Sequence, residues 1–120
     1  MAATQKFEEL IVWQRAHQFV LLVYRITAGF PKDELYGLTS QFRRAAVSIA
    51  ANIAEGYVKR TKPEKIRFLN ISQGSVEECR YYIILSRDLK FTTDDALGSL
   101  LEEVSKLLNS YTRAIKTSNI

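Results

Sequence analysis

The residues best suited to chemistry in this chain of 120 residues are cations in its middle third. Residues 35–62 contain five basic side chains and a single acid, Glu55. The basic residues there are Arg43, Arg44, Lys59, Arg60 and Lys62. Acids and bases nearly balance elsewhere, so this segment accounts for the formal net charge of +4. A local surplus of this kind attracts anions, including the phosphates of nucleic acid.

The densest part of the surplus spans an expected turn between two helices, where Tyr57 precedes the basic run and Lys65 and Arg67 follow it. Each phosphate neutralised by such a cluster makes binding more dependent on salt. A solvated turn that is basic for solubility alone explains the same pattern. Our candidate residues for nucleic-acid binding are Arg44, Lys59, Arg60, Lys62 and Lys65.

Patterns typical of catalysis or metal binding do not occur in the sequence. His17 is the only histidine, and no serine, cysteine or second histidine stands at a spacing that would make it a general base. Adjacent glutamates such as Glu77 and Glu78 diverge by about 100° on a helix, and they lack the Glu-x-x-His motif of di-metal bundles. Cys79 is alone, which excludes an intrachain disulfide and a cysteine zinc site. We expect no enzymatic activity, metal, cofactor or small-molecule substrate.

Apolar residues recur at spacings of three and four along four segments, as they do in amphipathic helices that pack together. The expected helices span residues 8–28, 34–55, 62–89 and 93–116. Gly56 should cap the second helix, and Thr61 with Glu64 forms a capping box for the third. Thr92 or Thr93 should cap the fourth. The sequence predicts one all-α domain over residues 1–120.

The second expected helix carries five alanines along residues 45–54, and small residues let another helix approach closely. In an antiparallel hairpin with the third helix, this surface would meet Gly74. Glu78 then lies on an inward row, one turn from Arg43, and an inward carboxylate needs a partner. We predict a structural pair between Arg43 and Glu78, with Asn52 or a neighbouring helix as alternative partners.

Three segments carry a resemblance to a known family. They are FEELIVWQRA, FPKDELYGLTSQFRRAAVSIAANIAEGY and KPEKIRFLNISQGSVEECRYYIILSRDL. From about Phe7 to Leu89, the chain resembles the four-helix-bundle proteins encoded in intervening sequences of bacterial 23S ribosomal RNA genes. Arg43-Arg44-Ala45, the run from Asn52 to Gly56, and Gly74-Ser75 with Glu78 are the most specific matches. Ala50 stands where proline is common in the family.

The resemblance implies an antiparallel, up-down, left-handed four-helix bundle, which assembles into a ring-like homopentamer in known members. It also implies a nucleic-acid role, because of the position of the genes and because related accessory proteins of diversity-generating retroelements work beside a reverse transcriptase and RNA. A fold and a gene position do not by themselves fix a function.

Our leading hypothesis is a non-enzymatic homo-oligomer that binds RNA, DNA or a ribonucleoprotein through its basic surface. The alternative is an oligomeric protein–protein adaptor or scaffold with no nucleic-acid role. The N-terminus lacks the features of a signal peptide, and no apolar run approaches the ~20 residues of a membrane span. We therefore expect a cytoplasmic protein without a membrane partner.

Overall fold

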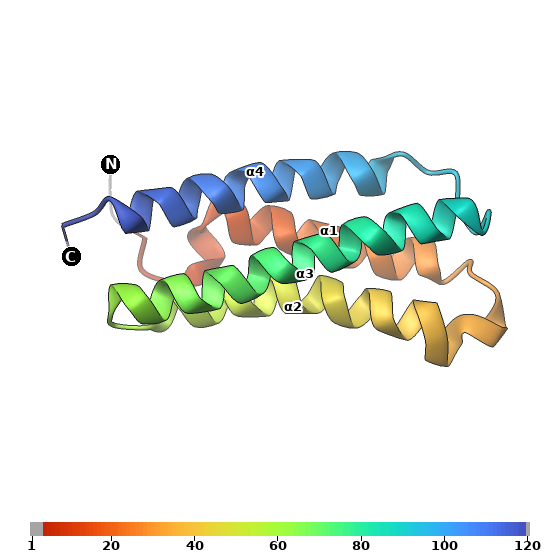
Figure 1. The fold of residues 1–120 in the computed structure, drawn as a ribbon, viewed down its shortest axis with the longest axis horizontal. Helices are drawn as coiled ribbons and strands as arrows, with labels where there is room; N and C mark the ends of the chain where they lie inside the picture. Colours follow the sequence, from red (N-terminus) through yellow and green to blue (C-terminus); the bar gives the residue numbers. More distant parts are fainter. Residues whose placement is uncertain (1–3, 120) are drawn as a thin grey trace.

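The computed structural model describes residues 4–119, and four long helices make up most of it (Figure 1). They are α1 (Ile11–Thr27), α2 (Ser40–Val58), α3 (Lys62–Asp88) and α4 (Ala96–Lys116). Successive helices run in opposite directions along a body of 49 × 24 × 20 Å. Each helix contacts the next one in the chain, and α4 closes against α1. The predicted all-α, four-helix fold is confirmed.

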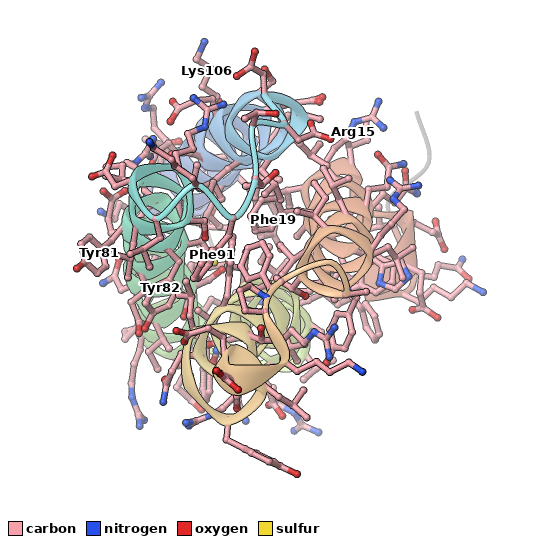
Figure 2. The ribbon with its side chains drawn as sticks, turned by 90° about the vertical axis from the view of Figure 1, so that its right-hand side faces the viewer. Arg15, Phe19, Tyr81, Tyr82, Phe91 and Lys106 are labelled. Carbon is pink, nitrogen blue, oxygen red and sulfur yellow. The ribbon has the colours of Figure 1, made fainter. Side chains whose placement is uncertain are left out.

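The core consists of one apolar stripe from each helix, which the spacing of three and four residues predicts. On α4 this stripe is Leu97, Leu101, Val104 and Leu108, each at most 1% exposed. Phe19 of α1 and Phe42 of α2 are fully buried, with their ring centroids 6.5 Å apart. Figure 2 shows Phe19 between the helices, whereas Lys106 projects from the surface. Burial of each large side chain contributes roughly 1.5–3 kcal/mol, so this core holds the surface residues on a stable scaffold.

The starts of three helices differ from the predicted ones. The segment before α1 forms a short 3-10 turn, η1 (Phe7–Glu9), so the α-helix begins at Ile11. Before α2 come another 3-10 turn, η2 (Lys32–Glu34), and a wide turn, η3 (Leu35–Thr39), which is broken at Gly37 (φ −112°, ψ −113°). The fourth helix starts at Ala96, because Asp94 Oδ1 accepts a hydrogen bond from the Ala96 backbone N–H (2.7 Å).

The predicted N-terminal cap of α3 is confirmed, since Thr61 Oγ1 accepts a hydrogen bond from the Glu64 backbone N–H (3.3 Å). The predicted cap at Gly56 is wrong, because α2 continues through it to Val58. Gly56 is buried against α3, where an added Cβ would lie 3.3 Å from both the Lys65 carbonyl oxygen and Phe68 Cβ. This glycine serves close helix packing instead of helix termination.

Two serines of α3 set its register against α2. Ser72 Oγ donates to the Ile49 carbonyl oxygen (2.9 Å), and the Ser75 and Ser48 hydroxyls are hydrogen-bonded (2.7 Å). Gly74 is exposed, and an added Cβ would meet nothing within 4 Å. The prediction that Gly74 faces the alanine surface is therefore wrong, because Gly74 lies on the outward side of α3. The two serine contacts also shift α3 by about one helical turn from the predicted register.

Within residues 4–119, no helix combines the length and the apolar character needed to cross a membrane.

Candidate nucleic-acid interface

Basic residues gather at the end of the bundle where α2 leads into α3 and where α4 terminates (Figure 1). We call this set the basic end; it comprises Lys59, Arg60, Lys62, Lys65, Arg67, Arg113 and Lys116. The Lys62 ammonium joins the two parts, because it donates to the carbonyl oxygens of Lys116 (3.3 Å) and Ser118 (2.7 Å). Of the candidate residues named above, the structure thus brings together four and leaves Arg44 elsewhere.

Lys62 and Lys65 both donate hydrogen bonds to backbone carbonyl groups at the basic end. Lys62 satisfies carbonyl groups at the C-terminus of α4, where backbone acceptors lack helical partners. Lys65 does the same for α2, donating to the carbonyl oxygens of Tyr57 (2.7 Å) and Gly56 (3.4 Å). Burial lowers the pKa of Lys65 below its ordinary value. Each ammonium also lies at the C-terminal, negative end of a helix dipole, where a positive charge is stabilising. Neither ammonium is therefore as available to an external anion as the sequence suggests.

The other cations of the α2–α3 turn are more accessible. Arg60 is exposed, and its side chain makes no ion pair or hydrogen bond within the described part of the chain. Lys59 forms an ion pair with Glu55 (3.6 Å), which is the kind of exposed pair that contributes little to stability. The ammonium of Lys59 and the guanidinium of Arg67 lie 5.0 and 5.5 Å from the centroid of the Phe68 ring. The turn thus combines cations that are not bound to backbone carbonyls with an aromatic ring.

A polar groove of 320 Å³ runs between α3 and α4 at the basic end. It is lined by Leu69, Asn70, Gln73, Asn109, Thr112, Arg113 and Lys116. A hollow of 710 Å³ continues it on α3, from Asn70 to Lys62 and Arg67. The groove offers amides and cations with no acidic side chain, so it suits an anionic ligand with hydrogen-bonding groups.

The contribution of α4 to the basic end is missing from the candidates that the sequence predicts. Arg113 and Lys116 lie more than fifty residues beyond the α2–α3 turn, in a segment whose net charge is slightly negative. The signal that could have found them is topological: in an antiparallel bundle, the last turn of the fourth helix lies beside the first turn of the third.

Arg44 is separated from the basic end by about 22 Å along α2, since fifteen residues at 1.5 Å each lie between it and Lys59. It is exposed, and the Ser48–Ser75 hydrogen bond places it level with Glu78 of α3. Arg44 and Glu78 have opposite effects on the pKa of Tyr82: Glu78 raises it, as does burial, and Arg44 lowers it.

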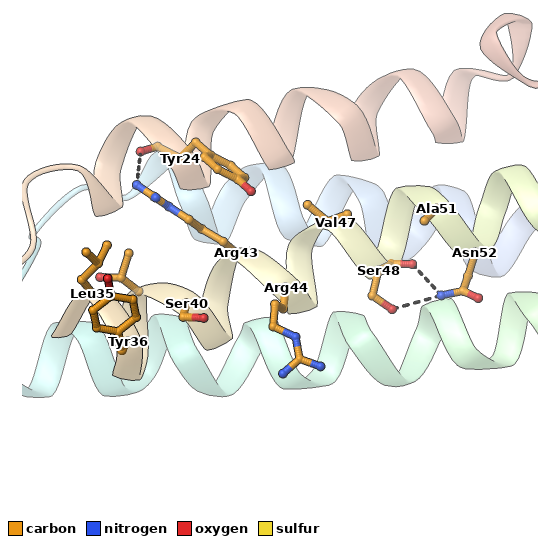
Figure 3. Close-up of a pocket in the computed structure, with 11 residues that line it drawn as sticks. Tyr24, Leu35, Tyr36, Ser40, Arg43, Arg44, Val47, Ser48, Ala51 and Asn52 are labelled. Atoms are coloured by element: carbon orange, nitrogen blue, oxygen red, sulfur yellow. Dashed lines mark hydrogen bonds between the residues drawn. The ribbon is translucent and has the colours of Figure 1, made fainter.

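The predicted pair between Arg43 and Glu78 is wrong. Arg43 Nε donates to Thr27 Oγ1 (2.9 Å), and its Nη2 donates to the Tyr24 carbonyl oxygen (3.4 Å; Figure 3). The guanidinium carbon lies 4.5 Å from the centroid of the Tyr24 ring. Glu78 is exposed on α3 and makes no ion pair with residues 4–119. The prediction fails because of side-chain direction: Arg43 points toward α1, whereas Glu78 lies on the solvent-facing side of α3.

Groups that could support other chemistry have packing roles or none. His17 is exposed and stacks on Trp13, with ring centroids 5.0 Å apart and planes 6° from parallel. Cys79 is a buried thiol whose pKa is raised chiefly by burial. Over residues 4–119, no three histidine, cysteine or carboxylate side chains are placed to hold a metal ion. The chemistry that the arrangement does offer is the binding of anions.

Comparison with known proteins agrees with the fold and with the sequence motifs. The model of the 23S rRNA-intervening sequence protein family matches residues 8–112. A crystal structure of a protein of unknown function from the S23 ribosomal protein family of Bacteroides thetaiotaomicron superposes with a TM-score of 0.74. The two chains are 23% identical over 86% of this chain and 99% of that one, a likeness that shows the fold alone. Curated proteins provide no match. The family match covers most of the chain, and the protein belongs to the 23S rRNA-intervening sequence protein family.

Proposed function

We propose that this protein is a non-enzymatic, homo-oligomeric bundle that binds nucleic acid, or a ribonucleoprotein, through its basic end. The observation that carries the proposal is the convergence of cations from the α2–α3 turn, the start of α3 and the end of α4. Glu55 and Glu64 are the nearby acids on α2 and α3. The family description names ribosomal RNA, which favours a nucleic-acid ligand and a cytoplasmic location.

Phosphate contacts should come from the cations that are neither hydrogen-bonded to backbone carbonyls nor, like Lys59, paired with an acid. These are Arg60, Arg67, Arg113 and Lys116, which are all exposed. Four phosphate contacts on B-DNA would give log affinity a slope of about −3.6 against log salt concentration. Asn70, Gln73 and Asn109 line the groove between α3 and α4, and their amides can donate to and accept from sugars or base edges.

The test is a titration of structured RNA and duplex DNA at several salt concentrations, with two charge-reversal variants. Arg60→Glu/Arg113→Glu changes the basic end, and Arg25→Glu/Lys106→Glu makes the same change in net charge on exposed positions of α1 and α4 outside it. We expect the first variant to lose at least about tenfold in affinity and about two units of salt slope. The second should stay close to the wild-type protein. Equal losses in both variants, or binding that does not depend on salt, would contradict the proposal.

We infer self-association, with a homopentamer as the expected form, from an apolar hollow of 240 Å³ between α1 and α2. It is lined by Phe7, Trp13, His17, Val20, Val47, Ala50, Ala51 and Ala54. Its alanines would let a helix of another copy approach closely. Light scattering should report a multiple of the chain mass that Ala51→Glu reduces and Ser99→Glu, on an exposed position of α4, does not. A monomeric wild-type protein would refute this inference.

The alternative function is an oligomeric adaptor that binds another protein. The capping roles of Lys62 and Lys65 favour it, because they explain part of the basic end without any external ligand. Absent nucleic-acid binding, with the oligomer intact, is the result that would select the adaptor.

A further inference from the structure

Away from the basic end, a groove of 710 Å³ lies along α2, facing α1 and the turn before α2 (Figure 3). We call it the Arg–Tyr groove. Its lining consists of Tyr24, Leu35, Tyr36, Thr39, Ser40, Arg43, Arg44, Val47, Ser48, Ala51 and Asn52. The lining includes two arginines and two tyrosines, and no acidic side chain. Two acids lie near the groove without lining it: Glu34, whose carboxylate closes the turn that carries Tyr36, and Glu78, which lies level with Arg44 on α3. A groove with this composition favours a ligand that is both planar and anionic.

Arg43 is fixed in place before any ligand arrives. Its guanidinium lies over the Tyr24 ring and is held by Thr27, whose hydroxyl donates in turn to the Val23 carbonyl oxygen (2.7 Å). Tyr24 itself remains 43% exposed. A guanidinium held in one plane provides a stacking surface for a base, and little side-chain entropy is lost when the base binds.

Tyr36 is the most exposed large apolar side chain in the described structure, at 92%. The η3 turn that carries it is closed by a hydrogen bond from the Leu38 backbone N–H to Glu34 Oε1 (3.1 Å). Gly37 allows this closure, because an added Cβ would lie 2.9 Å from the same Glu34 oxygen. This turn thus holds the Tyr36 ring away from the bundle, where the ring buries no surface in the core.

Polar groups complete the groove beyond the two arginines. Asn52 Nδ2 donates to the Ser48 carbonyl oxygen (2.8 Å) and to Ser48 Oγ (3.0 Å), as Figure 3 shows. The other amide atom, Asn52 Oδ1, accepts no hydrogen bond from residues 4–119. It is an acceptor for the amino group of a base. Arg44 is exposed and can contact a phosphate.

We propose that the Arg–Tyr groove binds a segment of single-stranded nucleic acid, with one base on Tyr36, a second on the Tyr24–Arg43 stack and a phosphate at Arg44. Bases in a duplex stack on each other and present only their edges, whereas aromatic platforms take the faces of unpaired bases. The groove therefore selects single strands, whereas the basic end, about 22 Å from Arg44 along α2, takes phosphates of either form. This inference rests on the proposed function for the class of ligand and assigns it a site separate from the basic end. The groove shares Val47 and Ala51 with the hollow inferred for self-association, so the two stacking positions and the phosphate contact lie at the other end of the groove.

The test measures fluorescence anisotropy with a labelled six-nucleotide oligouridine and with a labelled DNA duplex. Tyr36→Ala should weaken binding of the oligouridine by roughly 5- to 150-fold, the range for loss of one base–aromatic stack. Tyr36→Phe should restore it, because the ring remains. Tyr81→Ala removes an exposed tyrosine from α3 and should change binding of neither ligand. Duplex binding should stay within about twofold in all three variants.

The outcomes separate this inference from the proposed function. Equal effects of Tyr36→Ala and Tyr81→Ala on the oligouridine overturn the groove, while salt-dependent duplex binding lost in Arg60→Glu/Arg113→Glu still supports the basic end. If the protein does not bind the duplex but still binds the oligouridine in a Tyr36-dependent way, the proposed role of the basic end is wrong and the groove is supported. If Tyr36→Ala lowers the mass found by light scattering and leaves binding unchanged, the groove is a contact between copies and the inference is wrong.

Discussion

Two glycines of the α2–α3 hairpin should respond in opposite ways when each is replaced by alanine. Gly74 lies in the interior of α3, and a Cβ added there meets nothing within 4 Å. Alanine favours a helix over glycine by about 1 kcal/mol. Gly74→Ala should therefore raise the free energy of unfolding by roughly 0.5–1 kcal/mol and the melting temperature by roughly 2–5 °C.

Replacing Gly56 by alanine gives the same gain in helix propensity, but there is no room for the added Cβ. Its added Cβ would lie 3.3 Å from the Lys65 carbonyl oxygen and from Phe68 Cβ, and 3.6 Å from Leu69 Cδ2. The backbone oxygen cannot rotate away, so α2 and α3 must separate slightly, and overpacking of this kind costs about 1–3 kcal/mol. Gly56→Ala should change the free energy of unfolding by between about 0 and −2 kcal/mol.

The measurement is urea unfolding followed by circular dichroism, at two or more protein concentrations because association also stabilises the folded chain. The difference between the two variants should be roughly 1–3 kcal/mol in favour of Gly74→Ala. Destabilisation by Gly74→Ala that does not depend on protein concentration would refute the register, because Gly74 would then face α2. Stabilisation of equal size in both variants would refute close packing at Gly56.

Three further predictions concern the core and the helix ends. Thr27→Val should lower the free energy of unfolding by about 1–2 kcal/mol, because the half-buried Arg43 loses its acceptor. Thr39 is the control, since it is equally buried (3%) and its hydroxyl has no partner within residues 4–119. Thr39→Val should cost less than about 0.5 kcal/mol. Lys65→Met keeps the apolar stem and removes the ammonium that caps α2, so chemical unfolding should show a loss of about 1 kcal/mol, whereas no loss would mean that the two carbonyls do not need it. Cys79 is fully buried and its thiol pKa is raised, so a disulfide reagent should modify it at least about a thousandfold more slowly in the native protein than in urea; rapid native labelling would contradict the packing of α3.

The helices and the faces they bury could be predicted from the sequence because both depend on local information. Spacings of three and four identify Leu97, Leu101 and Val104 as core, and all three are buried. The Thr61 cap is likewise local. The end of α2 was harder to predict, because a glycine can serve either termination or close packing, and only the neighbouring helix decides which. The start of α4 was placed too early because the polar residues from Thr92 to Asp95 all suit a helix N-terminus.

The register of the hairpin could not be predicted, because the alanines along residues 45–54 offer similar small surfaces one turn apart. Ser72 and Ser75 select one register through their hydrogen bonds to α2, and nothing in their spacing indicates this. The same limit applies to the candidate site. The α2–α3 turn was found as a run of charge, whereas the cations of α4 join it only through the arrangement of the bundle.

The uneven distribution of cations along a body 49 Å long gives the molecule an electric dipole moment along its axis. At the opposite end, acids and bases are mixed: Asp33, Glu34, Asp88, Asp94 and Asp95 lie there with Lys32, Arg87 and Lys90. A polyanion therefore exerts a torque that turns the basic end toward it before contact. If copies assemble with parallel axes, their dipoles add and this torque grows with the number of subunits. If neighbouring copies alternate in direction, the dipoles cancel, so the symmetry of the assembly determines how strongly the protein is oriented on approach.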